Sequence, residues 1–96
     1  MSNSSLVNVK VPAHSNNYTI GRSGRKIEKI SIHHMAGILT VKQCGGICQN
    51  GSRKASSNYG IGKDAEVGLY VDEANTSYCN SNWDSNCKSV TIETSN

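Results

Sequence analysis

The segment that most constrains the fold is residues 26–37, in which apolar and polar side chains alternate before two adjacent histidines and a glycine. Side chains on a β-strand point to opposite faces in turn, so the alternation predicts a short strand with Ile30 and Ile32 on one face and His33 on the other. By the same period, His34 shares the face of the isoleucines and is expected to pack in the core. An imidazole on the polar face at a strand end is free to bind a metal ion or transfer a proton, so His33 is the functional candidate.

A second alternating segment, residues 89–93, predicts a strand of the same kind. Val90 and Ile92 share one face, and the opposite, polar face ends in Glu93. If this strand and the histidine strand are neighbours in one sheet, His33 and Glu93 project from the same side. A helix is then expected to cover the apolar face of the sheet.

Capping and turn residues predict the remaining elements. Thr40 fits the N-cap of a helix over residues 40–48. Strands are expected over residues 6–11, 57–61 and 66–71, with a turn at residues 62–65 between the last two. Residues 72–88 are polar and are expected to be irregular.

Length and composition allow one small domain, spanning residues 1–96. Only 35% of the residues are hydrophobic and Phe is absent, so the core must come from Val, Ile and Leu on strands, with Trp83 and four Tyr around it. A chain of this size buries a smaller share of its surface than a typical domain does, and its stability margin is expected to be thin.

The net charge of +3 is distributed unevenly, since Glu28 is the sole acidic residue in positions 1–54. A basic half can attract anionic polymers, but a solvated surface is the favoured interpretation. The basic residues are not interleaved with aromatic side chains, so no nucleic-acid partner is expected. Met1–Ser5 lacks the layout of a signal peptide and no apolar run could form a transmembrane segment, so synthesis in the cytoplasm is expected.

Four cysteines form the pattern C-x3-C…C-x7-C, which does not have the spacing of a known zinc motif. Cys44 and Cys48 lie in the expected helix, whereas Cys79 and Cys87 lie in the expected irregular region. Three interpretations remain open. The favoured one is packed or free thiols, followed by a disulfide between loop and helix, and then by a structural zinc site of all four cysteines.

Three sequence blocks carry a family resemblance. They are residues 30–37 (Ile-Ser-Ile-His-His-Met-Ala-Gly), residues 56–62 (Ser-Ser-Asn-Tyr-Gly-Ile-Gly) and residues 91–93 (Thr-Ile-Glu). In this order they resemble the zinc-dependent N-acetylmuramoyl-L-alanine amidases, the family of phage endolysins, bacterial autolysins and peptidoglycan recognition proteins. The resemblance covers nearly all of the chain from about Ile27 onward. It implies an α/β fold, with a central mixed β-sheet and packed helices, that is truncated at the C-terminus.

The resemblance also implies roles for three residues. A catalytic zinc takes three protein ligands and keeps one open position, where it acidifies water and polarises a carbonyl. His33 falls on the family's first zinc ligand, and Glu93 on the glutamate that orients or deprotonates the zinc-bound water. Tyr59 falls on the tyrosine whose hydroxyl donates to the oxyanion. Without the resemblance, Tyr59 would be interpreted as an ordinary aromatic in a half-buried strand.

In the family, the other two zinc ligands follow the Thr-Ile-Glu block, beyond Asn96. The domain is therefore expected to be incomplete, to have little activity alone, and to associate with a missing C-terminal part or as a homo-oligomer. The implied function is hydrolysis of the bond between N-acetylmuramic acid and the L-alanine of the stem peptide, in the bacterial cell wall, by a phage endolysin or autolysin. The alternative is a non-catalytic peptidoglycan-binding fragment or relic that lacks the full zinc site.

Overall fold

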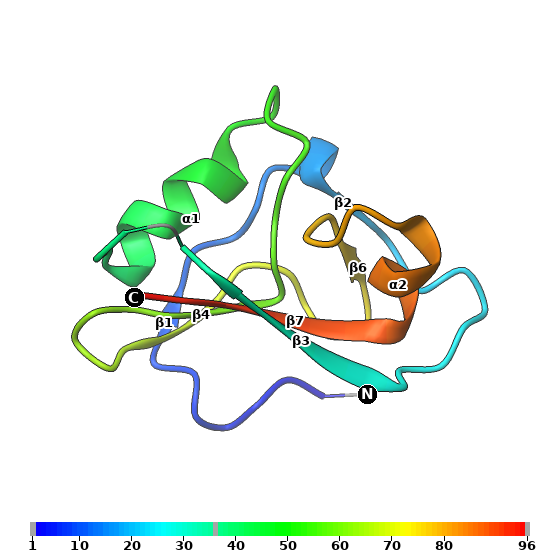
Figure 1. Cartoon of the computed structure of the whole chain (residues 1–96), viewed down its shortest axis with the longest axis horizontal. Helices are drawn as coiled ribbons and strands as arrows, with labels where there is room; N and C mark the ends of the chain where they lie inside the picture. The colour runs from blue at the N-terminus through cyan, green and yellow to red at the C-terminus, as the bar shows by residue number, and fades with distance from the viewer. Residues whose placement is uncertain (1, 36, 96) are drawn as a thin grey trace.

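The centre of the fold is a five-stranded mixed β-sheet in the order β1-β5-β4-β7-β3, accompanied by a two-stranded sheet of β2 and β6 (Figure 1). The computed structural model describes residues 2–35 and 37–95, so Met1, Asn96 and Ala36 of the histidine block lie outside the described residues. The strands are β1 (Val9–Lys10), β2 (Tyr18–Thr19), β3 (Lys29–His34), β4 (Tyr59–Ile61), β5 (Val67–Leu69), β6 (Thr76–Ser77) and β7 (Ser89–Thr94). The helices are η1 (Ser15–Asn17), α1 (Val41–Gln49) and α2 (Trp83–Lys88). The α/β fold with a central mixed sheet and packed helices is confirmed.

The two strands predicted from alternating side chains lie side by side. Strands β3 and β7 are parallel and pair over their whole length, with Lys29 opposite Ser89 and His33 opposite Glu93. Strand β4 continues the sheet parallel to β7, and β5 runs antiparallel to β4. The predicted strand over residues 6–11 is shorter than expected, since only Val9–Lys10 pairs, with β5.

Helix α1 begins where its cap predicted. The Thr40 side chain accepts a hydrogen bond from the backbone N–H of Gln43, and the Gln43 side chain accepts one from the backbone N–H of Thr40. This reciprocal capping box satisfies two N–H groups that a helix start leaves without partners. Within the described residues, no helix has the length and apolar character needed to cross a membrane.

The prediction that residues 72–88 are irregular is wrong. This segment contains strand β6 and helix α2, whose N-cap Asn82 accepts a hydrogen bond from the backbone N–H of Ser85. Asp84 in the first turn and Lys88 in the last turn both have the sign that favours interaction with the helix dipole. A polar helix of six residues has no apolar period to reveal it, because its position depends on contacts with β6 and β7.

The helices cover the opposite face of the sheet from the one expected. Figure 1 shows α1 and α2 on the same side of the sheet, and α1 packs against β4 and β5. A Cβ at Gly68 would overlap the side chain of Val41 in α1. Gly60 is opposite Glu93, so the covered face is the polar face of β7. The expectation that a helix covers the apolar face is therefore wrong.

The apolar face of β3 is open instead. Ile30 and Ile32 are 66% and 67% exposed, and His34 on the same strand face is exposed as well. The expectation that His34 packs in the core is therefore wrong, for the same reason. Gly68 on β5 leaves the space that Val41 of α1 occupies, so α1 packs on the other side of the sheet.

Hydrogen-bonded polar groups fill much of the covered interior. The side chain of Asn58 lies there without exposure, and its Oδ1 accepts from the backbone N–H of Thr91 while its Nδ2 donates to the carbonyl of Val71. Every buried side-chain nitrogen and oxygen in the described residues has a partner. This is how a chain with few apolar residues keeps its interior free of unsatisfied polar groups. The apolar core is correspondingly small; its buried members are Val11, Met35, Val41, Cys44, Cys48, Tyr70 and Val71.

Candidate functional site

His33 and Glu93 form the centre of the candidate site. They are cross-strand neighbours in the β3–β7 register, so their side chains leave the same face of the sheet. Both are half-buried, and both lie near the carboxyl ends of adjacent parallel strands. In sheets of parallel strands, ligand sites form at this end. The structure therefore brings together two of the three residues that the sequence singled out.

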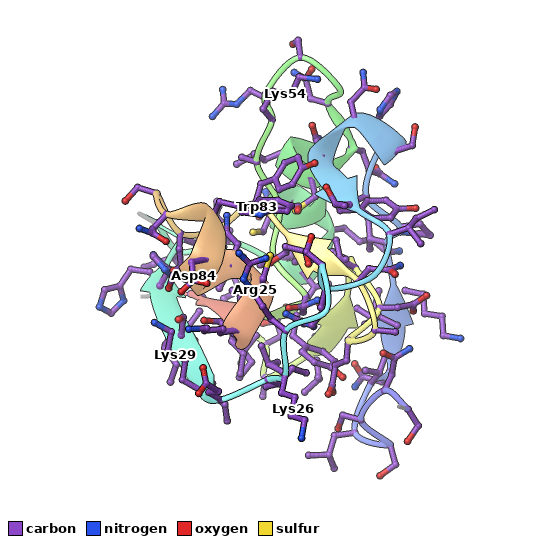
Figure 2. The ribbon with its side chains drawn as sticks, turned by 90° about the vertical axis from the view of Figure 1, so that its right-hand side faces the viewer. Arg25, Lys26, Lys29, Lys54, Trp83 and Asp84 are labelled. Carbon is purple, nitrogen blue, oxygen red and sulfur yellow. The ribbon has the colours of Figure 1, made fainter. Side chains whose placement is uncertain are left out.

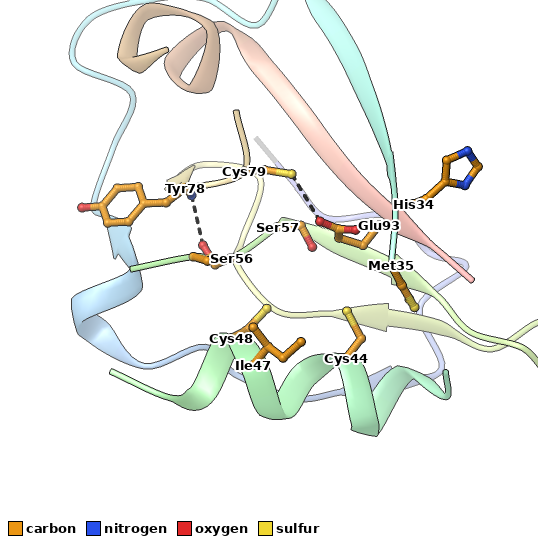
Figure 3. Close-up of a pocket in the computed structure, with 11 residues that line it drawn as sticks. His34, Met35, Cys44, Ile47, Cys48, Ser56, Ser57, Tyr78, Cys79 and Glu93 are labelled. Atoms are coloured by element: carbon orange, nitrogen blue, oxygen red, sulfur yellow. Dashed lines mark hydrogen bonds between the residues drawn. The ribbon is translucent and has the colours of Figure 1, made fainter. Parts of the chain in front are cut away.

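Glu93 lies in a pocket between α1 and the segment around Cys79 (Figure 3). The thiol of Cys79 donates a hydrogen bond to Glu93 Oε1, with the two atoms 3.7 Å apart. Burial raises the pKa of the Glu93 carboxyl above its ordinary value, while the nearby His33 and the thiol hydrogen bond oppose that rise. A carboxylate whose pKa is raised toward the working pH is a better proton acceptor.

Thiols line much of this pocket. Figure 3 shows the side chains of Cys44 and Cys48 pointing from α1 toward the pocket, which Cys79 and Glu93 border on the far side. Burial raises the pKa of Cys48 to about 12, and burial together with Glu93 raises the pKa of Cys79 to about 12. These thiols are therefore protonated at neutral pH, and the thiolate is the form that binds metal or attacks as a nucleophile.

All four cysteines are free in this structure. Cys44, Cys48 and Cys87 are buried and Cys79 is half-buried, which agrees with the favoured interpretation of packed or free thiols. The disulfide between loop and helix that was considered next is absent from the described residues.

His33 has a partner that the sequence analysis missed. The Nε2 atom of His33 lies 2.8 Å from Oδ1 of Asn80. Asn80 is in the segment expected to be irregular. The backbone N–H of Asn80 donates a hydrogen bond to the side chain of Asn86 in α2. Asn82, a residue type that is common at N-caps, was a local signal that a helix could begin in this segment.

Tyr59 does not join the other two residues. It is opposite Ile92 in the β4–β7 register, so its side chain leaves the face of the sheet that does not carry Glu93. There its hydroxyl accepts a hydrogen bond from the backbone N–H of Ser4 and donates one to Glu73. Burial, followed by the hydrogen bond to Glu73, raises the pKa of Tyr59 to about 12. Of the block that contains Tyr59, the residues that line the pocket with Glu93 are Ser56 and Ser57.

The fit to zinc extends to one ligand. His33 is half-buried beside a carboxylate, and its Nε2 is already engaged by an amide, as is common for histidines that bind a metal through the other nitrogen. The described residues contain no group of three or more His, Cys, Asp or Glu that could hold a metal ion. Within residues 2–35 and 37–95, His33 is therefore a candidate zinc ligand without a second and third ligand beside it.

Four basic side chains of the first half lie apart from one another. Figure 2 shows Lys54 at the opposite end of the molecule from Lys26 and Lys29, and Arg25 beside Asp84. The Nε atom of Arg25 lies 2.8 Å from Oδ1 of Asp84 in a half-exposed ion pair. These four basic residues therefore do not form one cluster.

Comparison with known proteins gives one family. The family model described as N-acetylmuramoyl-L-alanine amidase matches residues 23–96, a range that contains β3, β7 and all three sequence blocks. Comparison with curated proteins gives no significant match, and neither does comparison with solved structures. The matched range covers well over half of the chain, so the chain belongs to the N-acetylmuramoyl-L-alanine amidase family.

Proposed function

We propose that this protein hydrolyses the amide bond between N-acetylmuramic acid and the L-alanine of the peptidoglycan stem peptide. The observation that carries the proposal is the juxtaposition of His33 and Glu93, on one face and at the carboxyl ends of two parallel strands. The family match supports the class of reaction and the polymer on which it acts. The site of action is then the bacterial cell wall, and a phage endolysin or an autolysin is the matching biological role.

Glu93 is the proton-handling residue of this proposal. A water molecule that attacks the carbonyl must lose a proton, and the leaving amine must gain one. A half-buried carboxylate with a raised pKa can accept the first proton and deliver it to the amine. The Cys79 thiol, which donates to Oε1, holds this carboxylate in place.

His33 would bind a zinc ion as one ligand of the set. When bound, zinc supplies an acidified water and an electrophile for the carbonyl oxygen. This chain fixes the position and the orientation of that ligand. Strand β3 sets the position of His33 relative to Glu93, and Asn80 restrains the His33 ring. Tyr59 is left out of the chemistry because its hydroxyl lies on the other face of the sheet.

The test is the appearance of new L-alanine amino termini in purified peptidoglycan incubated with the protein and zinc. We expect release that is sensitive to a chelator and is lost in His33→Ala and in Glu93→Gln. The matched control is Lys29→Ala, since Lys29 is exposed on the same strand and does not line the pocket that contains Glu93. Equal release by all three variants would refute the assignment of the site.

A second candidate is peptidoglycan binding without hydrolysis, favoured because the described residues contain no group of three or more His, Cys, Asp or Glu that could hold a metal ion. The assay for new L-alanine amino termini also distinguishes the two candidate functions. A binding protein sediments with insoluble peptidoglycan and releases no L-alanine amino termini at any zinc concentration. An amidase releases them, even if slowly, and release stops with Glu93→Gln.

A further inference from the structure

A chain of hydrogen bonds with a fixed direction ends at the backbone carbonyl of Ser85. The hydroxyl of Ser89 lies 2.6 Å from that carbonyl, which can only accept, so Ser89 donates its one proton there. The Ser31 hydroxyl lies 3.2 Å from Ser89 Oγ. Because the proton of Ser89 is already used, Ser31 must donate to Ser89. The direction of both hydroxyl groups is thereby set by the carbonyl.

The same reasoning orients the amide of Asn80. Ser31 has no second proton, so its oxygen accepts from the amide Nδ2 of Asn80, 3.4 Å away. The same Nδ2 lies 3.2 Å from the hydroxyl of Ser85. With its NH2 group held by two serines, Asn80 presents its carbonyl oxygen, Oδ1, to Nε2 of His33 at 2.8 Å. An amide oxygen only accepts, so Nε2 of the neutral imidazole must carry the proton.

We propose that Asn80 is a positioning residue that holds His33 as the Nε2–H tautomer, which leaves the lone pair on Nδ1. Neutral imidazole has one donor and one acceptor nitrogen, so a proton fixed on Nε2 makes Nδ1 the atom available to a metal ion. The order Ser85–Ser89–Ser31–Asn80–His33 connects the start of β7 to the end of β3. The metal part of this inference rests on the proposed function, whereas the tautomer does not.

The tautomer is measured by nitrogen-15 NMR of the histidine rings in the metal-free protein, above the pH at which imidazole is charged. We expect the His33 Nε2 signal at the position of a protonated nitrogen and the Nδ1 signal at the position of an unprotonated one. The exposed ring of His34 serves as the internal comparison. A His33 ring protonated on Nδ1, or one that exchanges freely between tautomers, would overturn the proposal.

Substitutions of Asn80 separate its orienting role from a general structural one. Asn80→Ala should shift His33 toward a mixture of tautomers, and Asn80→Asp should restore the Nε2–H form because a carboxylate also accepts. The matched control is Asn82→Ala, which removes the cap of α2 without touching His33. Unchanged His33 signals in Asn80→Ala, or equal changes in Asn80→Ala and Asn82→Ala, would show that Asn80 does not set the tautomer.

Titration of the metal-free protein with Zn²⁺ tests the second half of the inference. We expect the Nδ1 signal of His33 to shift on binding, with affinity about 10-fold lower in Asn80→Ala. Binding through Nε2, with loss of the contact to Asn80, would overturn the inference. If His33 has the expected tautomer but no signal shifts at any zinc concentration, the proposed metal role of His33 fails while the role of Asn80 as its positioning residue stands.

Discussion

Replacing Arg22 with methionine should remove much of the stability of this protein, although Arg22 is not one of the candidate site residues. The guanidinium is buried, with 7% of the residue exposed. It donates to the backbone carbonyls of four residues at distances of 2.8–3.1 Å. These carbonyls belong to Glu73, Asn86, Cys87 and Ser89. One side chain therefore joins the loop before β3 to the end of α2 and the start of β7.

The expected loss follows from what the methionine leaves behind. Methionine fills a similar volume without donors, so the carbonyls stay buried and lose a charged partner. The carbonyl of Asn86 keeps a hydrogen bond from the backbone N–H of Ser89. Each buried acceptor that is left without a partner costs about 1–3 kcal/mol, and the recovered desolvation energy of the guanidinium offsets part of the sum. We expect a net loss of about 3–5 kcal/mol for Arg22→Met. A domain of this size has roughly 5–14 kcal/mol of stability, so the variant should be marginal.

The assay is urea unfolding followed by far-ultraviolet circular dichroism, with Arg25→Met as the matched control. Arg25 lies three positions later and makes a half-exposed ion pair with Asp84 (Figure 2), which is worth about 1 kcal/mol or less. Arg22→Met should also lower Tm by about 4–8 °C for each kcal/mol lost. If Arg22→Met costs no more than Arg25→Met, the carbonyl contacts of Arg22 do not hold this region together and the reasoning is refuted.

Three further predictions use the same unfolding assay. Ile32→Thr should change stability by less than about 0.5 kcal/mol because Ile32 is 67% exposed, whereas Val41→Ala, at a fully buried position, should cost about 2 kcal/mol. Gly68→Ala should cost about 1–3 kcal/mol because the added methyl group overlaps Val41. Burial raises the pKa of Glu93, so this carboxyl favours the native state below its ordinary pKa and the benefit is lost as pH rises through the raised value. Metal-free Glu93→Gln should thus gain stability relative to wild type between acid and neutral pH, and an unchanged difference across that range would contradict the burial argument.

The sequence was sufficient for the elements that local patterns encode. Alternation in residues 30–33 and 90–93 predicted both β3 and β7, and it predicted that His33 and Glu93 share a face if the two strands are neighbours, which they are. Thr40 and Gln43 marked the start of α1 because a capping box is a contact between residues three apart.

Alternation separates the two faces of a strand but does not say which face turns inward. Here Gly68 on β5 leaves the space that Val41 of α1 occupies, and Gly60 on β4 leaves space for Tyr70, so the polar side is the one that is covered. The place of Tyr59 depended on the register between β4 and β7, which is a tertiary property without a local signal. Asn80 was missed for a related reason, since its contact with His33 joins positions that are far apart in the chain.

The parallel pairing of β3 with β7 also has a kinetic consequence. Strand β3 is at the edge of the sheet, and among the described residues its strand neighbour is β7, whose paired residues come 60 positions later in the chain. Contacts between distant parts of a chain form slowly because a long loop must close first. Synthesis proceeds from the N-terminus, so a nascent chain presents Ile30 and Ile32 unpaired until β7 has been made. Because the contact between His33 and Glu93 depends on this long-range pairing, we expect the slowest folding phase to coincide with the formation of the site.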